Sequence, residues 1–265
     1  MLDQDPGEGL ELLVDLARAT DPALRARARR LAPALIVPAA RQPGPSPTGG
    51  CSRIGPVVGL GADLDVDATL EAAEVPGAAH LRAGDLRWRG WRRPGRAVVL
   101  LVDASGSVHG PPLVTALVTV AALLSRSDPH DELAVVAFWS RAVVLRDLRD
   151  PSPPEAVVER LLRLRGGDTT DLAAGLEAAL SQAALAGTGR RDVLALTDGL
   201  ATEGADPVPV AGSAPGAGVA LHVLALAAQV ESMAACADLA GAGGGRLLPL
   251  HGPWQAPAAV AAALR

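Results

Sequence analysis

The apolar residues in the second half of the chain fall into short, unbroken runs. The clearest run, residues 97–102, reads AVVLLV. Similar runs lie within residues 131–140, 190–199, 218–227 and 246–250. Runs of this length, rich in valine and leucine, predict strands covered on both faces, as in a parallel sheet. Residues 142–146 are expected to form a short hairpin partner of the second strand.

Segments with helical patterns separate these runs. Pro111 and Pro112 open a stretch that is apolar all round, which predicts a largely buried helix. Further helices are expected at residues 155–164, from 171 onward, at 231–240 and at 257–265. Alternating strands and helices predict an α/β fold over residues 96–265: a Rossmann-like, doubly wound, mostly parallel sheet flanked by helices.

The first 95 residues have a different pattern. Residues 1–38 predict a small helical N-terminal segment, which could dock on the domain or on something else. Residues 39–61 are rich in Pro, Gly and Ser, which predicts a flexible linker. Residues 62–95 predict a lead-in helix, with Asp67 as its N-cap, and then an edge strand.

The lead-in strand alternates tryptophan with arginine, as in Trp88, Arg89 and Trp91. Such interleaving could stack nucleic-acid bases, but alternation is also the pattern of a strand with one buried face. We prefer the strand, because the formal net charge of −5 and the sequence pI of about 5.5 argue against nucleic acid as a partner.

Composition narrows the remaining classes. Cys51 and Cys236 lie far apart, with no CxxC or Cys/His spacing, so we expect reduced structural cysteines and no zinc site. No apolar run reaches the roughly 18 residues that span a bilayer, and no basic segment precedes an apolar one near Met1. We therefore expect a cytoplasmic protein without a membrane partner.

Polar clusters follow three of the predicted elements. Asp103, Ser105 and Ser107 follow the first strand, and Thr170 stands in the loop GGDTTDL before a helix. Asp198 ends the strand of residues 190–199. Ligands bind at the carboxyl edge of open α/β sheets, and hydroxyl and carboxylate oxygens suit hard ions such as Mg²⁺, Mn²⁺ or Ca²⁺.

These three pieces together, Asp-x-Ser-x-Ser, the threonine loop and Thr-Asp-Gly, resemble the metal-ion-dependent adhesion site (MIDAS) of von Willebrand factor A domains. The resemblance implies that Ser105, Ser107 and Thr170 bind a divalent ion directly. It implies that Asp103 and Asp198 act through water. Thr169 stays an alternative to Thr170, because the loop carries two threonines.

The segment DLRWRGWRRPGRAVVLLVDASGS is similar to cytoplasmic bacterial members of that family. These include partners of MoxR-type AAA+ ATPases and the D subunit of magnesium chelatase. The resemblance implies a non-enzymatic adaptor whose Mg²⁺ is bridged by an acidic residue of a protein partner, most simply a MoxR-type ATPase. A chelatase-like subunit is less favoured, because the chain has no GxxxxGK[ST] loop and no lysine.

A Mg²⁺-dependent phosphoryl-transfer hydrolase is the competing hypothesis. A strand-end aspartate beside Mg²⁺ is also the nucleophile of phosphatases that resemble haloacid dehalogenases. Those enzymes need a second acid two residues later, where this chain has Ser105, and a downstream lysine, which it lacks.

Overall fold

The computed structural model describes residues 31–38, 40, 53–57, 63–72, 86–92, 95–105, 111–125, 128, 130–164, 166–226 and 229–265. Contacts divide the chain into two units. Unit 1 comprises residues 1–47 and 95–265, and unit 2 comprises residues 48–94. No helix among the described residues is both long and apolar enough to cross a bilayer.

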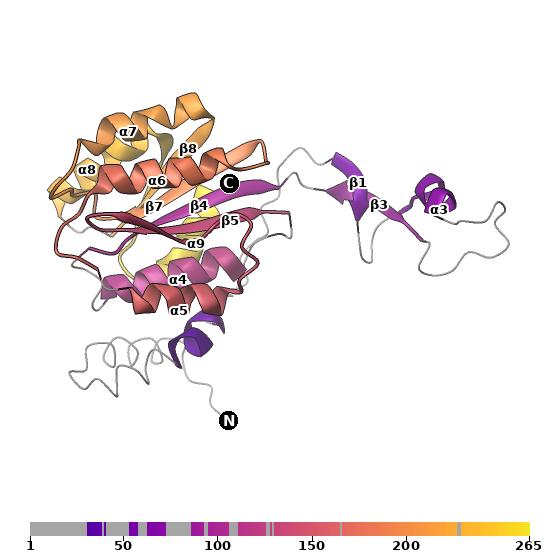
Figure 1. Ribbon diagram of the computed structural model, residues 1–265, viewed down its shortest axis with the longest axis horizontal. Helices are drawn as coiled ribbons and strands as arrows, with labels where there is room; N and C mark the ends of the chain where they lie inside the picture. The colour runs from indigo at the N-terminus through magenta and orange to yellow at the C-terminus, as the bar shows by residue number, and fades with distance from the viewer. Residues whose placement is uncertain are drawn as a thin grey trace. The chain divides into compact units, whose positions relative to one another are not determined.

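Unit 1 is built on a six-stranded sheet in the order β6-β5-β4-β7-β8-β9 (Figure 1). The strands are β4 (Arg96–Asp103), β5 (Glu132–Phe138), β6 (Ala142–Arg146), β7 (Arg190–Thr197), β8 (Val219–Ala225) and β9 (Gly244–Pro249). All neighbouring pairs are parallel except β5 and β6, which are antiparallel. The mostly parallel α/β sheet predicted from the apolar runs is confirmed.

Helices cover both faces of this sheet (Figure 1). One buried cluster joins the sheet to α4 (Pro111–Ser125), α5 (Pro154–Arg163) and α9 (Ala256–Ala263). The other joins it to α6 (Leu172–Ala184), α7 (Pro207–Ser213) and α8 (Val230–Ala242). Short 3₁₀ helices at Pro215–Ala217 and Pro253–Gln255 complete the connections. The sheet is therefore doubly wound, as predicted.

Strand β4 shows why an unbroken apolar run was required. Its side chains alternate between the two clusters: Val98 and Leu100 lie in one, and Val99 and Leu101 in the other. All four are at most 1% exposed. A central strand buried on both faces has no solvent side on which a polar residue could stand.

The described part of the N-terminal segment belongs to unit 1 and packs against its helices. Residues 31–38 are helical, in agreement with the helix expected there, and residue 40 is helical as well. Ala32, Ile36 and Val37 are at most 2% exposed and belong to the same buried cluster as α4, α5 and α9. The sequence left open whether this segment docks on the α/β domain or on something else, and its described residues dock on the domain.

Unit 2 differs from the expectation. It contains β1 (Arg53–Val57), β2 (Asp63–Leu64), α3 (Val66–Ala72) and β3 (Trp88–Arg92). The sheet order is β1-β3-β2, with antiparallel pairs, so β3 is a central strand of a separate sheet and not an edge strand of the main one. Its partner β1 lies inside the predicted linker, because pairing with β3 overrides the poor strand propensity of Gly and Pro.

Helix α3 begins earlier than predicted. The Asp65 carboxylate accepts a hydrogen bond from the Ala68 amide at 3.1 Å, and the Asp65 carbonyl accepts one from the Thr69 amide at 2.9 Å. Asp65 is therefore the N-cap. Asp67 lies within the first turn, where its negative charge interacts favourably with the helix dipole and stabilises the helix.

Candidate metal centre

The first polar cluster is held at the end of β4. Asp103 is the last residue of this strand and is 9% exposed. Its Oδ1 accepts hydrogen bonds from the Ser105 amide at 3.0 Å and the Ser105 hydroxyl at 2.6 Å. Its Oδ2 accepts one from the Thr197 hydroxyl at 2.9 Å. The carboxylate is thus oriented by its own loop and by the neighbouring strand β7.

The second cluster lies where β7 ends. Thr197 is fully buried, and its hydroxyl accepts a hydrogen bond from the Gly199 amide at 3.1 Å. Gly199 has φ +80°, and a Cβ there would lie 2.8 Å from the Cys236 sulfur. Glycine therefore permits the turn that follows Asp198, whose carboxylate accepts from the Leu200 amide at 3.0 Å.

The third cluster precedes α6 and is tied to the end of β5. The Asp171 amide donates to the Trp139 carbonyl at 2.7 Å, and the Ala104 amide donates to the Phe138 carbonyl at 2.7 Å. The end of β5 therefore holds both the loop after β4 and the threonine loop. Asp171 is also the N-cap of α6, because its carboxylate accepts from the Ala174 amide at 2.9 Å.

The two threonines of this loop differ in their surroundings. Thr170 is 6% exposed; its amide donates to the Thr202 hydroxyl at 2.7 Å, and its carbonyl accepts from the Thr202 and Glu203 amides. Within the described residues its own hydroxyl has no hydrogen-bond partner. Thr169 is exposed, and its hydroxyl donates to Glu203 at 2.7 Å. The geometry favours Thr170 as the residue with a hydroxyl available to a ligand.

Among the described residues, no cationic side chain pairs with the carboxylates at this edge. Burial raises the pKa of Asp103, and the nearby Asp198 carboxylate adds to that rise, while hydrogen bonds from Ser105 and Thr197 oppose it. Burial and Asp198 also raise the pKa of the Cys236 thiol to about 12. No described residue forms an ion pair with Asp103 or Asp198. Two neighbouring carboxylates without a cationic side chain are suited to a bound cation.

The donor chemistry fits a hard divalent ion. The donors are hydroxyl and carboxylate oxygens, and no group of three or more His, Cys, Asp or Glu suited to a metal occurs among the described residues. Such a set suits Mg²⁺, Mn²⁺ or Ca²⁺ better than zinc, which prefers nitrogen and sulfur. Mg²⁺ usually keeps several waters and takes few protein ligands, so a small set of oxygens is sufficient.

The structure brings four of the five predicted residues to one edge of the sheet: Asp103, Ser105, Thr170 and Asp198. Ser107, the fifth, lies outside the described residues. The sequence alone did not show that the Thr197 hydroxyl would orient Asp103, or that Thr202 would hold the threonine loop. A threonine at the end of an apolar strand was the only available signal for the first of these contacts.

Comparison with known proteins agrees with this fold. The family model for the von Willebrand factor type A domain matches residues 97–246, more than half of the chain. BatB from Bacteroides thetaiotaomicron has a TM-score of 0.53 at 18% identity, over 64% of this chain and 97% of that one. An aerotolerance-related membrane protein from Bacteroides fragilis has a TM-score of 0.52 at 19% identity, over 64% of this chain and 98% of that one. Identities this low show the fold alone.

Two curated proteins match in sequence. The uncharacterized protein Rv2850c of Mycobacterium tuberculosis is 34% identical over 122 residues, 44% of this chain. The uncharacterized protein sll0103 of Synechocystis sp. is 31% identical over 104 residues, 38% of this chain. The matched parts span only 19% and 24% of those proteins. The match to more than half of the chain, together with the doubly wound sheet, places this protein in the von Willebrand factor type A domain family.

Proposed function

We propose that this chain is a metal-dependent protein-interaction module and not an enzyme. Three hydroxyl groups bind Mg²⁺ directly, those of Ser105, Ser107 and Thr170, and Mn²⁺ or Ca²⁺ can take its place. The carboxylates of Asp103 and Asp198 contact the ion through water. The observation that carries the proposal is the buried Asp103 carboxylate, which is fixed by three hydrogen bonds, lies close to Asp198 and has no described cation beside it.

The protein's own groups preorganise the site. The Ser105 hydroxyl donates its hydrogen to Asp103, which fixes the direction of this hydroxyl at the end of β4. The three hydrogen bonds to Asp103 use three of roughly four acceptor positions on a carboxylate, leaving room for a water that bridges to an ion. When bound, the ion supplies a Lewis acid whose open position accepts a carboxylate from another protein.

The partner in this proposal is a MoxR-type AAA+ ATPase in a bacterial cytoplasm, acting in protein remodelling or maturation. The support is the similarity of the arginine-rich segment before β4 to the adaptors of such ATPases, together with family membership. A partner carboxylate is the chemistry that a site of neutral hydroxyls and one open metal position would select.

A phosphoryl-transfer hydrolase finds less support in the geometry. The two Asp103 oxygens accept hydrogen bonds from Ser105 and Thr197, which reduces the nucleophilicity of the carboxylate. A second acid is absent at position 105. Phosphatase turnover that Asp103→Asn abolishes would favour the hydrolase.

A pull-down of the full chain against its candidate ATPase tests the proposal. We expect capture in Mg²⁺ and loss of capture in EDTA. The double variant Ser105→Ala with Ser107→Ala should behave in Mg²⁺ as the wild type does in EDTA. Ser213→Ala is the matched control, because this exposed serine on α7 donates only to the Val210 carbonyl. Capture that neither chelation nor the double variant reduces would overturn the proposal.

A further inference from the structure

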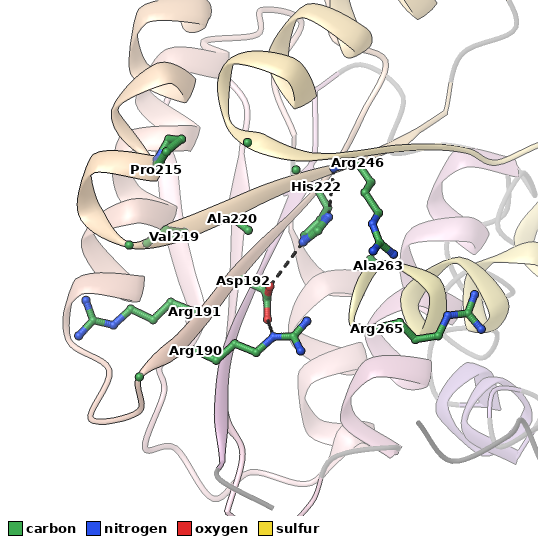
Figure 2. A pocket seen from close by; sticks show the side chains of 14 residues that line it. Arg190, Arg191, Asp192, Pro215, Val219, Ala220, His222, Arg246, Ala263 and Arg265 are labelled. Carbon is green, nitrogen blue, oxygen red and sulfur yellow. Dashed lines mark hydrogen bonds and ion pairs between the residues drawn. The ribbon is translucent and has the colours of Figure 1, made fainter. Parts of the chain in front are cut away.

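A second pocket lies at the opposite, amino edge of the same sheet (Figure 2). It has a volume of about 650 Å³, within the range of small-molecule sites. The first residues of β7 and β8 and the start of β9 line it. Strand β7 separates the two sites, because it begins at Arg190 beside this pocket and ends at Thr197 beside the candidate metal centre.

The side chains that line this pocket are strongly cationic. Its residues include four arginines and one carboxylate: Arg190, Arg191, Arg246, Arg265 and Asp192. Figure 2 shows the guanidinium group of Arg190 beside Asp192 and that of Arg246 beside Ala263, whereas those of Arg191 and Arg265 point away from them. Arg190 therefore pairs with the buried Asp192 carboxylate, and Arg246 adds a further positive charge to the lining.

The carboxylate is already neutralised by its neighbours. Asp192 is 3% exposed, and its Oδ2 accepts from the Arg190 Nε at 3.0 Å. Its Oδ1 lies 3.4 Å from the His222 Nε2. The Arg246 amide donates to the His222 Nδ1 at 3.2 Å, so Nε2 carries the ring hydrogen and donates it to Asp192. Both ring nitrogens have hydrogen-bond partners, so the His222 ring is held in one orientation beneath the pocket.

The arginines also hold the end of α9, which is the structural explanation for their presence. Arg246 donates to the Ala262 carbonyl at 2.9 Å, and Arg190 donates to the Leu264 carbonyl at 3.1 Å. These bonds use only part of each side chain. A guanidinium has five N–H donors; Arg246 uses one and Arg190 uses two within the described structure. The unused donors exceed what capping a helix end requires.

Glycines keep the pocket open. A Cβ at Gly189 or Gly218 would meet nothing within 4 Å, so the absence of side chains there leaves space at the wall. At Gly245 a Cβ would lie 1.9 Å from the Leu221 carbonyl oxygen, so β9 stays close to β8 beside His222 only because this residue is glycine. An open pocket with two partly used guanidinium groups in its lining suits the oxygens of a phosphate group.

We propose that this pocket binds a small phosphate-bearing molecule, which Arg190 and Arg246 hold beside the hydrogen-bonded pair Asp192 and His222. The planar forks come from two different strands, so they approach one anionic group from two directions, which suits a group with three oxygens better than a flat carboxylate. The size of the cavity favours a small molecule over a nucleic-acid strand.

Calorimetric titration of the full chain with inorganic pyrophosphate, in EDTA without divalent ions, tests this site. EDTA keeps the candidate metal centre out of the measurement, so the outcome does not depend on the proposed function. We expect saturable binding that Arg246→Gln weakens roughly tenfold or more. Gly189→Glu, which fills the wall with a negative charge, should weaken it similarly and keeps the test valid if Arg246→Gln does not fold.

The matched control is Arg149→Gln. Arg149 is exposed and follows β6, at the far end of the strand order from β8 and β9, and its loss removes the same charge. It should leave the affinity for pyrophosphate unchanged. The proposal is overturned if pyrophosphate does not bind, if citrate binds as tightly, or if Arg149→Gln weakens binding as much as Arg246→Gln does.

Discussion

The contact between α6 and β5 predicts the result of a one-carbon substitution. Gly175 lies in α6 against the ring of Phe138, which is fully buried. A Cβ at Gly175 would lie 2.6 Å from the Phe138 Cγ, well inside the ~3.5 Å at which carbon atoms make their best contact. Overpacking of this kind costs about 1–3 kcal/mol, and alanine regains about 1 kcal/mol of helix propensity over glycine. We expect Gly175→Ala to lower the free energy of unfolding by about 0–2 kcal/mol.

Gly212→Ala is the matched substitution, because Gly212 also lies in a helix, α7, and a Cβ there meets nothing within 4 Å. It should raise the free energy of unfolding by about 0.5–1 kcal/mol. Urea denaturation followed by circular dichroism measures both changes. Equal stability of the two variants would refute the reasoning. Because α6 begins beside Thr170, the Gly175 variant should also bind Mg²⁺ more weakly than the Gly212 variant.

Three further predictions concern single side chains. Mg²⁺ at 100 times its Kd should stabilise the wild-type protein by ~2.7 kcal/mol and so raise its melting temperature. Thr170→Ala should abolish this rise, whereas Thr169→Ala should retain it. The reverse result would make Thr169 the ligand. The Ser152 and Arg160 contacts lower the pKa of Asp150 to about 2, so its stabilising effect is complete above about pH 4 and is lost as the pH falls through 2. Asp150→Asn should therefore cost about 1 kcal/mol at pH 7, allowing for solvent screening, and clearly less at pH 2, where the folded carboxyl is about half protonated, as measured by urea denaturation at both pH values. The Cys236 thiol, with its pKa raised to about 12, should resist alkylation at pH 8 until the protein unfolds; mass spectrometry showing rapid labelling of the native protein would contradict this.

The sequence predicted the central sheet well because burial on both faces constrains every position. Residues 97–102 have no polar member, and the strand they form is covered by helices on both sides. The polar clusters could also be predicted to meet, since parallel strands place their carboxyl ends at one edge. Asp103 and Asp198 lie there for that reason.

Other features depend on contacts between residues distant in the chain. Strand β1 has a composition typical of a loop, and only its pairing with β3 makes it a strand. The pocket at the amino edge forms where the starts of three strands come together. The residues next to Arg190 and Arg246 in the sequence show no pattern that predicts such a pocket. Single-residue propensities contain no information on such pairings.

The division into units has a consequence for the order in which the protein folds during synthesis. In the sequence, unit 2 stands between the two segments of unit 1, after the helical residues 31–38 and before strand β4. Its three strands leave the ribosome before any strand of the large sheet exists, so unit 2 can fold first. Ile36 shares a buried cluster with α4, α5 and α9, which are all translated later. The helical residues 31–38 therefore cannot be buried until these three helices have been synthesised. A pause in translation after unit 2 would leave their apolar side chains exposed to chaperones.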